Sequence, residues 1–75
     1  MKVQVKVIGY LIHQAGFGEK EVEISGPATA DELLTILHIE KSLPKFLTRN
    51  GQGITPAEKL EDGDRVVIAP LYSGG

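Results

Sequence analysis

The sequence contains no cysteine and no excess of basic residues. Without cysteine, a disulfide framework, a thiolate metal site and catalysis by a protein thiol are all excluded. Eight Lys and Arg stand against ten Asp and Glu, which gives a formal net charge of −2 at pH 7. Nonspecific nucleic-acid binding needs a basic surface that displaces counterions, so we expect no nucleic-acid partner.

Long apolar runs are also missing. The N-terminal segment alternates Lys2, Gln4 and Lys6 with valines. It has neither the apolar block of a signal peptide nor the length of a membrane span. We therefore expect a cytoplasmic protein with no membrane partner.

The size of the chain limits what it can do. Its 75 residues are enough for one small domain, and a domain of this size buries only about 60% of its unfolded surface. A core one layer thick leaves no walls for a deep substrate pocket. We therefore expect a protein that is not itself an enzyme.

Patterns typical of metal and nucleotide sites are absent as well. The only histidines, His13 and His38, fall on different predicted elements and lack a metal-ligand spacing, so we expect no metal. Residues 16–18 and 51–53 read Gly-x-Gly but lack the remainder of a phosphate-binding or dinucleotide-binding motif. We interpret both as turns.

Two segments alternate apolar and polar residues with a period of two, which is typical of half-buried strands. In residues 1–9 the inward positions are valines, and in residues 19–25 they are Val22 and Ile24. The outward positions 19, 21 and 23 are glutamates, which we interpret as solvated charges that keep the sheet edge soluble. The connection 10–18 is longer than a tight hairpin and has room for a short helical turn.

One main helix is predicted between the strands. Thr29 and Glu32 form the pattern of a capping box, and Leu33, Ile36 and Leu37 follow at helical spacing. The helix is expected from about Ala30 to Ile39.

The second half of the chain reads as three further strands. Asn50-Gly51 predicts a type I′ turn between short strands at 46–49 and 52–55. A turn-like segment at 56–60 should insert Leu60 into the core. The β-branched run 66–69 follows the turn signal 61–64 and predicts a buried strand that ends at Pro70, which has no amide to donate.

These elements predict an α+β fold: a mixed sheet of four to five strands with one main helix packed on one face. The first and last strands are the most apolar and should lie centrally and parallel. Residues 1–70 would form the domain, and residues 71–75 a flexible C-terminal tail. We expect the core to contain Val3, Val5, Val7, Val22, Ile24, Leu33, Leu37, Leu43, Leu47, Leu60, Val66 and Ile68.

The tail is the principal candidate for a reactive site, because it ends in Gly74 and Gly75. Its five residues reach roughly 17 Å when extended. A terminal carboxylate on such an arm, with no Cβ on the last two residues, can enter a narrow active site on another protein. We therefore interpret the tail as a substrate.

Several apolar residues should face away from the core beside this tail. If Val66 and Ile68 point inward, a period of two turns their neighbours outward. The alternative is scattered exposed apolar residues, which are normal. We favour a docking surface, and with the adjoining serine of the tail the expected partner-binding residues are Phe46, Val67, Ala69, Leu71, Tyr72 and Ser73.

The element order and the Gly-Gly end resemble the ubiquitin-like β-grasp fold. Within it, the chain is most similar to the sulfur-carrier branch, which comprises the small subunit of molybdopterin synthase and the thiamine-biosynthesis sulfur carrier. The similarity is sharpest in Asn50-Gly51, in the Leu-x-x-Gly-Asp-x-Val pattern of residues 60–66, and in residues 73–75. The long first connection looks more like the molybdopterin-synthase subunit.

This resemblance implies a carrier and not an enzyme. A ubiquitin-activating-like enzyme would adenylate the carboxylate of Gly75 with ATP, and a sulfur donor would convert it to a thiocarboxylate. The sulfur would serve molybdopterin synthesis, thiamine synthesis or tRNA thiolation, and a synthase large subunit is a further implied partner. No intrinsic cofactor is implied, because ATP is used by the partner.

Two other functions stay open on the sequence. The chain could be a ubiquitin-like modifier that is joined to lysines of other proteins through Gly75. It could also be a β-grasp interaction module with an inert tail. The chemical state of Gly75 in the protein from its native cell separates the three.

Overall fold

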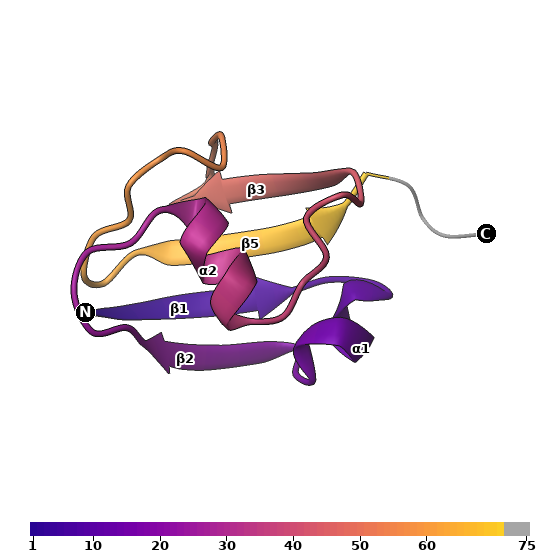
Figure 1. Ribbon diagram of the computed structural model, residues 1–75, viewed down its shortest axis with the longest axis horizontal. Helices are drawn as coiled ribbons and strands as arrows, with labels where there is room; N and C mark the ends of the chain where they lie inside the picture. The colour runs from indigo at the N-terminus through magenta and orange to yellow at the C-terminus, as the bar shows by residue number, and fades with distance from the viewer. Residues whose placement is uncertain (72–75) are drawn as a thin grey trace.

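A twisted mixed sheet carries one main helix across one of its faces in the computed structural model (Figure 1). The structure describes residues 1–71. The strand order is β2-β1-β5-β3-β4, with β1 and β5 parallel and the other pairs antiparallel. The predicted α+β architecture, with the first and last strands central and parallel, is confirmed. The elements are β1 (Lys2–Val7), α1 (Leu11–Ala15), β2 (Glu19–Glu23), α2 (Ala30–Ile36), β3 (Lys45–Arg49), β4 (Gln52–Gly53) and β5 (Arg65–Pro70).

The core lies between the sheet and α2 and follows from the alternation in the strands. Val5 of β1 lies beside Val66 of β5, and Val3 lies opposite Val22 of β2, with all four side chains buried. Every predicted core residue is buried except Leu43, which is half-buried and packs against the core. The structure adds core residues that the prediction omitted: Leu11, Ala28, Ala30, Leu34 and Ile39.

The start of α2 is as predicted, but its end is not. The Thr29 Oγ1 accepts the Glu32 amide at 3.2 Å and the Glu32 carboxylate accepts the Thr29 amide at 3.0 Å, which completes the capping box. The helix then ends at Ile36 and not at Ile39, because His38 adopts a left-handed φ of 60°.

This early end is a Schellman motif. The Ile39 amide donates to the Leu34 carbonyl at 3.0 Å, and the His38 amide donates to the Thr35 carbonyl at 3.1 Å. The two bonds satisfy carbonyls that the helix leaves without partners. They also turn Ile39 back into the core, where it is 3% exposed.

The β3–β4 hairpin closes on Asn50-Gly51, whose φ values of 53° and 85° are both positive, as a type I′ turn requires. The second strand of this hairpin was expected at 52–55 but is shorter and stops at Gly53. One more backbone bond joins Ile54 to Leu47 at 2.9 Å, and then the Thr55 carbonyl accepts from Glu58 to begin a turn. That turn leads to Leu60, which is buried as predicted.

A network around Asp64 fixes the start of β5. The buried Asp64 carboxylate accepts the Glu61 amide at 2.7 Å and the Asn50 Nδ2 at 3.0 Å, and the Arg49 Nε lies 3.7 Å away. The Asn50 Oδ1 accepts the Arg65 amide at 2.9 Å. The residues that carried the sequence resemblance therefore join the hairpin turn to the last strand.

None of the helices within residues 1–71 has the length and apolar character to cross a bilayer.

Candidate functional site

The outer sheet face, defined as the face opposite α2, holds most of the predicted docking residues that the structure describes. Because Val66 and Ile68 are buried under α2, Val67 and Ala69 point to the other face. In the β3–β5 register Phe46 lies opposite Ala69. Phe46 is 58% exposed, and Val67 and Ala69 are half-buried. The three apolar residues therefore share one surface.

The sequence prediction missed Ile8 on this face. Ile8 follows β1, its amide donates to the Ile68 carbonyl at 2.9 Å, and its side chain is 40% exposed. The parallel register of Val7 with Ile68 sets Ile8 beside Ala69. The sequence did contain a signal for this residue. Of the outward positions 2, 4, 6 and 8, only position 8 is apolar. We call Ile8, Phe46, Val67 and Ala69 the outer apolar patch.

Polar side chains continue this face beyond the patch. Lys6 and Thr48 flank Val67 in the register of the sheet. A groove of about 200 Å³ follows between β1 and β5, lined partly by Gln4, Glu19 and Arg65. The outer face therefore has an apolar end near the C-terminus of β5 and a polar end near its start.

The exit of β5 is held in place by contacts on both sides. β5 ends at Pro70, as its missing amide predicts, and Pro70 lies opposite Lys45. On the other side a Cβ added to Gly9, whose φ is +67°, would lie 3.1 Å from the Pro70 Cγ. Gly9 therefore combines a left-handed backbone with a close approach to the proline ring.

Leu71, the last residue described, stays attached to the domain. Its amide donates to the Pro44 carbonyl at 3.2 Å, and its side chain is 46% exposed. It borders a groove on the helix side that Leu34, Leu43 and Ile54 also line. Leu71 thus lies at the edge between the outer face and this second surface.

A lysine lies at the same exit. The Lys45 ammonium donates to the carbonyls of Leu43 and Lys41. Partial burial lowers the pKa of Lys45, and the nearby Glu40 carboxylate opposes that shift. The cation is therefore held against the 41–44 loop, beside the point where the chain leaves the sheet.

The remaining predicted site residues, Tyr72, Ser73, Gly74 and Gly75, lie outside the described residues. Their roles stay predictions. Within residues 1–71 no group of three His, Asp or Glu side chains is placed to hold a metal ion.

Comparisons with known proteins place this geometry in a family. The model of the ThiS family matches residues 5–75. SAMP1 from Haloferax volcanii is 22% identical and has a TM-score of 0.76, with 100% of both chains covered. A putative molybdopterin converting factor, subunit 1, from Pyrococcus furiosus is 26% identical with a TM-score of 0.79, covering 96% of this chain and 99% of that chain. A comparison with curated proteins gave no match.

These likenesses confirm the predicted ubiquitin-like β-grasp fold, because the superpositions extend over nearly the whole of each chain. The family model also extends to the final glycine and so includes both the outer face and the C-terminal segment. This chain belongs to the ThiS family.

Proposed function

We propose that this protein is a sulfur carrier, and that a separate ATP-dependent enzyme activates its Gly75 carboxylate. The observation that carries the proposal is the match to the ThiS family over residues 5–75, which includes the Gly-Gly end. The protein would act as a small carrier or subunit, and its partner would supply the catalytic groups.

The proposed chemistry has two steps. A carboxylate oxygen of Gly75 attacks the α-phosphorus of ATP, and pyrophosphate leaves, so that an acyl adenylate forms. Hydrosulfide supplied by the donor then attacks the acyl carbon and displaces AMP, which leaves a thiocarboxylate on Gly75. A glycine at this position leaves the acyl carbon unhindered, and Gly74 can adopt backbone angles closed to other residues.

The outer apolar patch would dock the activating enzyme, with Leu71, Tyr72 and Ser73 contributing as the chain enters the active site. The patch adjoins the last residues of β5, so a partner bound there would lie next to the exit of the tail. Exposed apolar surface that is rimmed by polar residues is typical of protein–protein contacts. Lys6, Thr48 and Arg65 supply such a rim here.

The test compares the intact protein with a variant that lacks Gly75. Incubation with the cognate adenylating enzyme, ATP and a sulfur donor should increase the intact mass by the replacement of one oxygen by sulfur. Deletion of Gly75 should abolish ATP–pyrophosphate exchange, because the reach shortens by about 3.5 Å. A misplacement of 1 Å at a reacting centre already costs on the order of a hundredfold in rate.

The melting temperature is the control for this deletion, and we expect no change because the buried core is formed by residues between Val3 and Ile68. A second variant with one alanine added after Gly75 should also fail to exchange, because the added residue carries the carboxylate past the phosphate. Full exchange by the deletion variant would refute the assignment of Gly75 as the reactive residue.

A second function, protein modification, rests on the likeness to SAMP1, whose solved structure is described as a small archaeal modifier protein. In that case an acceptor lysine amine would displace AMP and form an isopeptide bond to Gly75. Mass spectrometry of proteins from the native cell would find Gly-Gly remnants on lysines. An unmodified Gly75 under all conditions would instead indicate an inert interaction module.

The likeness to the Pyrococcus furiosus protein makes a molybdopterin precursor the first sulfur acceptor to test. A thiamine intermediate and a tRNA base are the alternatives. Supply of each precursor to the thiocarboxylate form, with its synthase, would show which one takes up the sulfur.

A further inference from the structure

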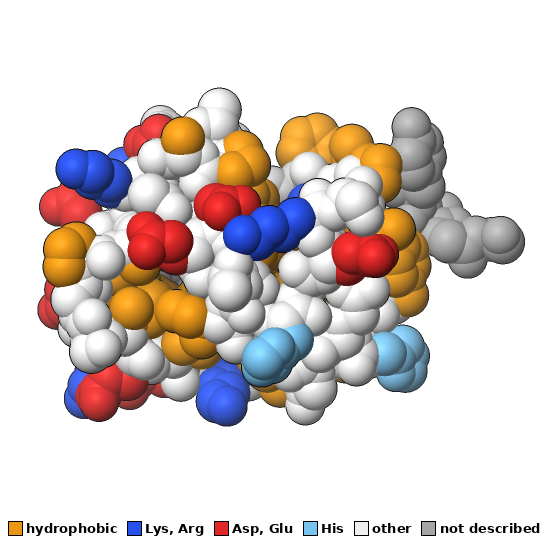
Figure 2. Space-filling view, in the orientation of Figure 1, with side chains coloured by type: hydrophobic (Ala, Val, Ile, Leu, Met, Phe, Trp, Pro, Cys, Tyr) orange, Lys and Arg blue, Asp and Glu red, His pale blue; other side chains and the backbone are white. Residues whose placement is uncertain are grey.

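A second apolar surface lies between β2 and α2, away from the outer face. It is a groove of about 510 Å³. Its floor contains Ile24, Ala28 and Ile36, and the Ile36 side chain is 46% exposed. Figure 2 shows apolar side chains gathered on this side of the molecule, toward the end opposite the C-terminus.

One wall of the groove belongs to a sheet edge, because β2 is an outer strand and, among residues 1–71, pairs only with β1. The Ile24 and Met1 backbones exchange hydrogen bonds of 2.7 and 2.8 Å. In an antiparallel ladder such pairs alternate, so Val22 also bonds toward β1 while Glu21 and Glu23 direct their amides and carbonyls outward. These outward groups can pair with an added strand.

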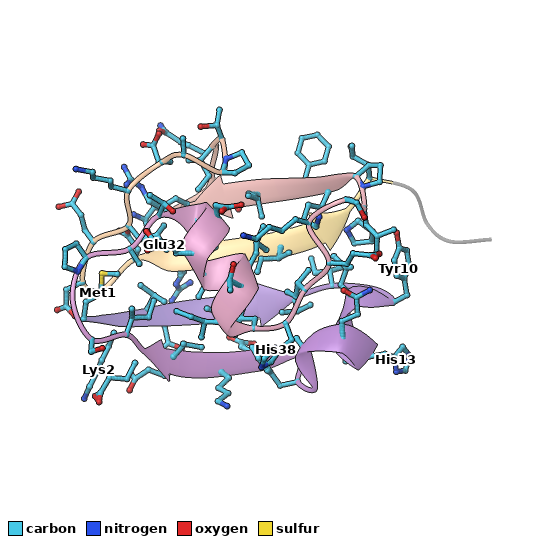
Figure 3. All side chains as sticks on the ribbon, viewed as in Figure 1. Met1, Lys2, Tyr10, His13, Glu32 and His38 are labelled. Carbon is cyan, nitrogen blue, oxygen red and sulfur yellow. The ribbon has the colours of Figure 1, made fainter. Side chains whose placement is uncertain are left out.

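The charged residues that line the groove are both acidic. Glu23 and Glu32 are the charged residues of its lining, and among residues 1–71 neither forms an ion pair within 4.0 Å. Lys2 is the cross-strand neighbour of Glu23. Glu32 lies at the start of α2, where it is labelled in Figure 3, and its Oε1 is used in the capping box.

We propose that this groove binds an extended segment of a partner protein, which adds to β2 as an antiparallel or parallel strand. The free backbone groups of Glu21 and Glu23 would bond the segment. Side chains of the segment that face α2 would cover Ile36. A lysine or arginine on its other face would meet Glu23, whose side chain lies on the outer sheet face beside Lys2.

A second copy of this chain fits less well. Pairing of β2 with β2 would bring the glutamates at 19, 21 and 23 of both copies close together, and like charges on adjacent strands repel. Glutamates on an edge strand oppose such self-pairing. They favour a basic segment for the same electrostatic reason. The inference does not depend on the chemistry of the tail.

The test is a selection of random linear peptides on the folded protein, followed by mapping of a selected peptide by amide chemical shifts. We expect enriched peptides with alternating apolar residues and a flanking lysine or arginine. Their addition should shift the amides of Glu21, Glu23 and α2. Methylation of alternate peptide nitrogens should remove binding in one register and spare it in the other, as strand addition requires.

Two variants and one control make the result specific. Ile36→Ser should weaken binding by about tenfold, because the residue is the apolar contact of the groove. Glu23→Lys should weaken it severalfold and reduce its salt dependence. The matched control is Ile12→Ser on α1, which changes an isoleucine that is 37% exposed outside the groove, and it should bind as the wild type does.

The inference is overturned if no peptide binds with a dissociation constant below about 1 mM. It is equally overturned if the selected peptides are acidic, if their shifts map to the outer apolar patch, or if the protein self-associates through β2.

Discussion

Substitution of Phe46 by threonine tests whether the outer apolar patch docks the activating enzyme. Phe46 is 58% exposed, and a large aromatic side chain buries about 150–250 Å² when covered. A partner that covers the exposed part removes roughly 100 Å² from water, which is worth about 2.5 kcal/mol at about 25 cal/mol per Å². Part of this is offset by the ordering of both surfaces. We therefore expect adenylation to lose about 1–2 kcal/mol of transition-state stabilisation.

The assay is ATP–pyrophosphate exchange with the carrier as the varied substrate. A loss of about 1–2 kcal/mol lowers kcat/KM roughly fivefold to thirtyfold, since about 1.4 kcal/mol corresponds to tenfold. The loss should appear mainly as a raised KM with kcat retained, because docking stabilises the bound complex and the transition state equally. Threonine keeps the strand preference of β3, so the domain should remain folded.

The matched control is Ile36→Thr, which removes a similarly exposed apolar side chain from the helix side. Ile36→Thr should leave the exchange kinetics unchanged, whereas Ile8→Thr should act in the same direction as Phe46→Thr with a smaller effect. Wild-type kinetics of Phe46→Thr, or an equal loss in Ile36→Thr, would refute the docking role of the outer face.

The sequence predicted the sheet well because each strand had a local signal that agreed with its tertiary position. The alternation around Val3 and Val5 matches a strand that is covered by α2 on one face. Asn50-Gly51 specifies a turn with two positive φ values, and both values are found. The residues of the family pattern were recognised by type, but their role in the Asp64 network required the three-dimensional arrangement.

The predicted end of α2 at Ile39 was wrong for an identifiable reason. His38 adopts the left-handed conformation, which usually falls to glycine or asparagine, so no residue type marked the end of the helix. Apolar residues continue at helical spacing as far as Ile39, and the side chain of Ile39 is buried. The pattern therefore could not separate a longer helix from a Schellman turn.

For the site, the sequence could place residues on a face but not measure exposure. The period of two along each strand correctly predicted that the side chains of Phe46 and Ala69 share the outer face. Leu71 does not follow from it, since its position depends on the bond between its amide and the Pro44 carbonyl. The groove beside β2 combines residues from β2 and α2, so only the fold brings it together.

Three stability predictions follow from the core, the network and the end of the helix, each measured by thermal and urea unfolding. Leu33→Ala should cost about 2–5 kcal/mol, because Leu33 is 1% exposed in the core; a loss below about 1 kcal/mol would contradict its placement there. Asp64→Ala should cost about 1–3 kcal/mol, because it leaves the Glu61 amide and the Asn50 Nδ2 without their acceptor, and a melt equal to that of the wild type would show the network to be dispensable. His38→Gly, in contrast, should stabilise the protein. A left-handed backbone costs a residue with a Cβ about 1–2 kcal/mol, which glycine avoids. Glycine is also more flexible in the unfolded chain, and this flexibility offsets about 0.5–1 kcal/mol of the gain. The expected gain is therefore up to about 1.5 kcal/mol, and each kcal/mol raises the melting temperature by about 4–8 °C in a domain of this size. His38→Ala is the control, because it removes the imidazole and keeps the positive φ, and it should bring no such gain. If His38→Gly melts no higher than His38→Ala, the positive φ at residue 38 does not destabilise the domain.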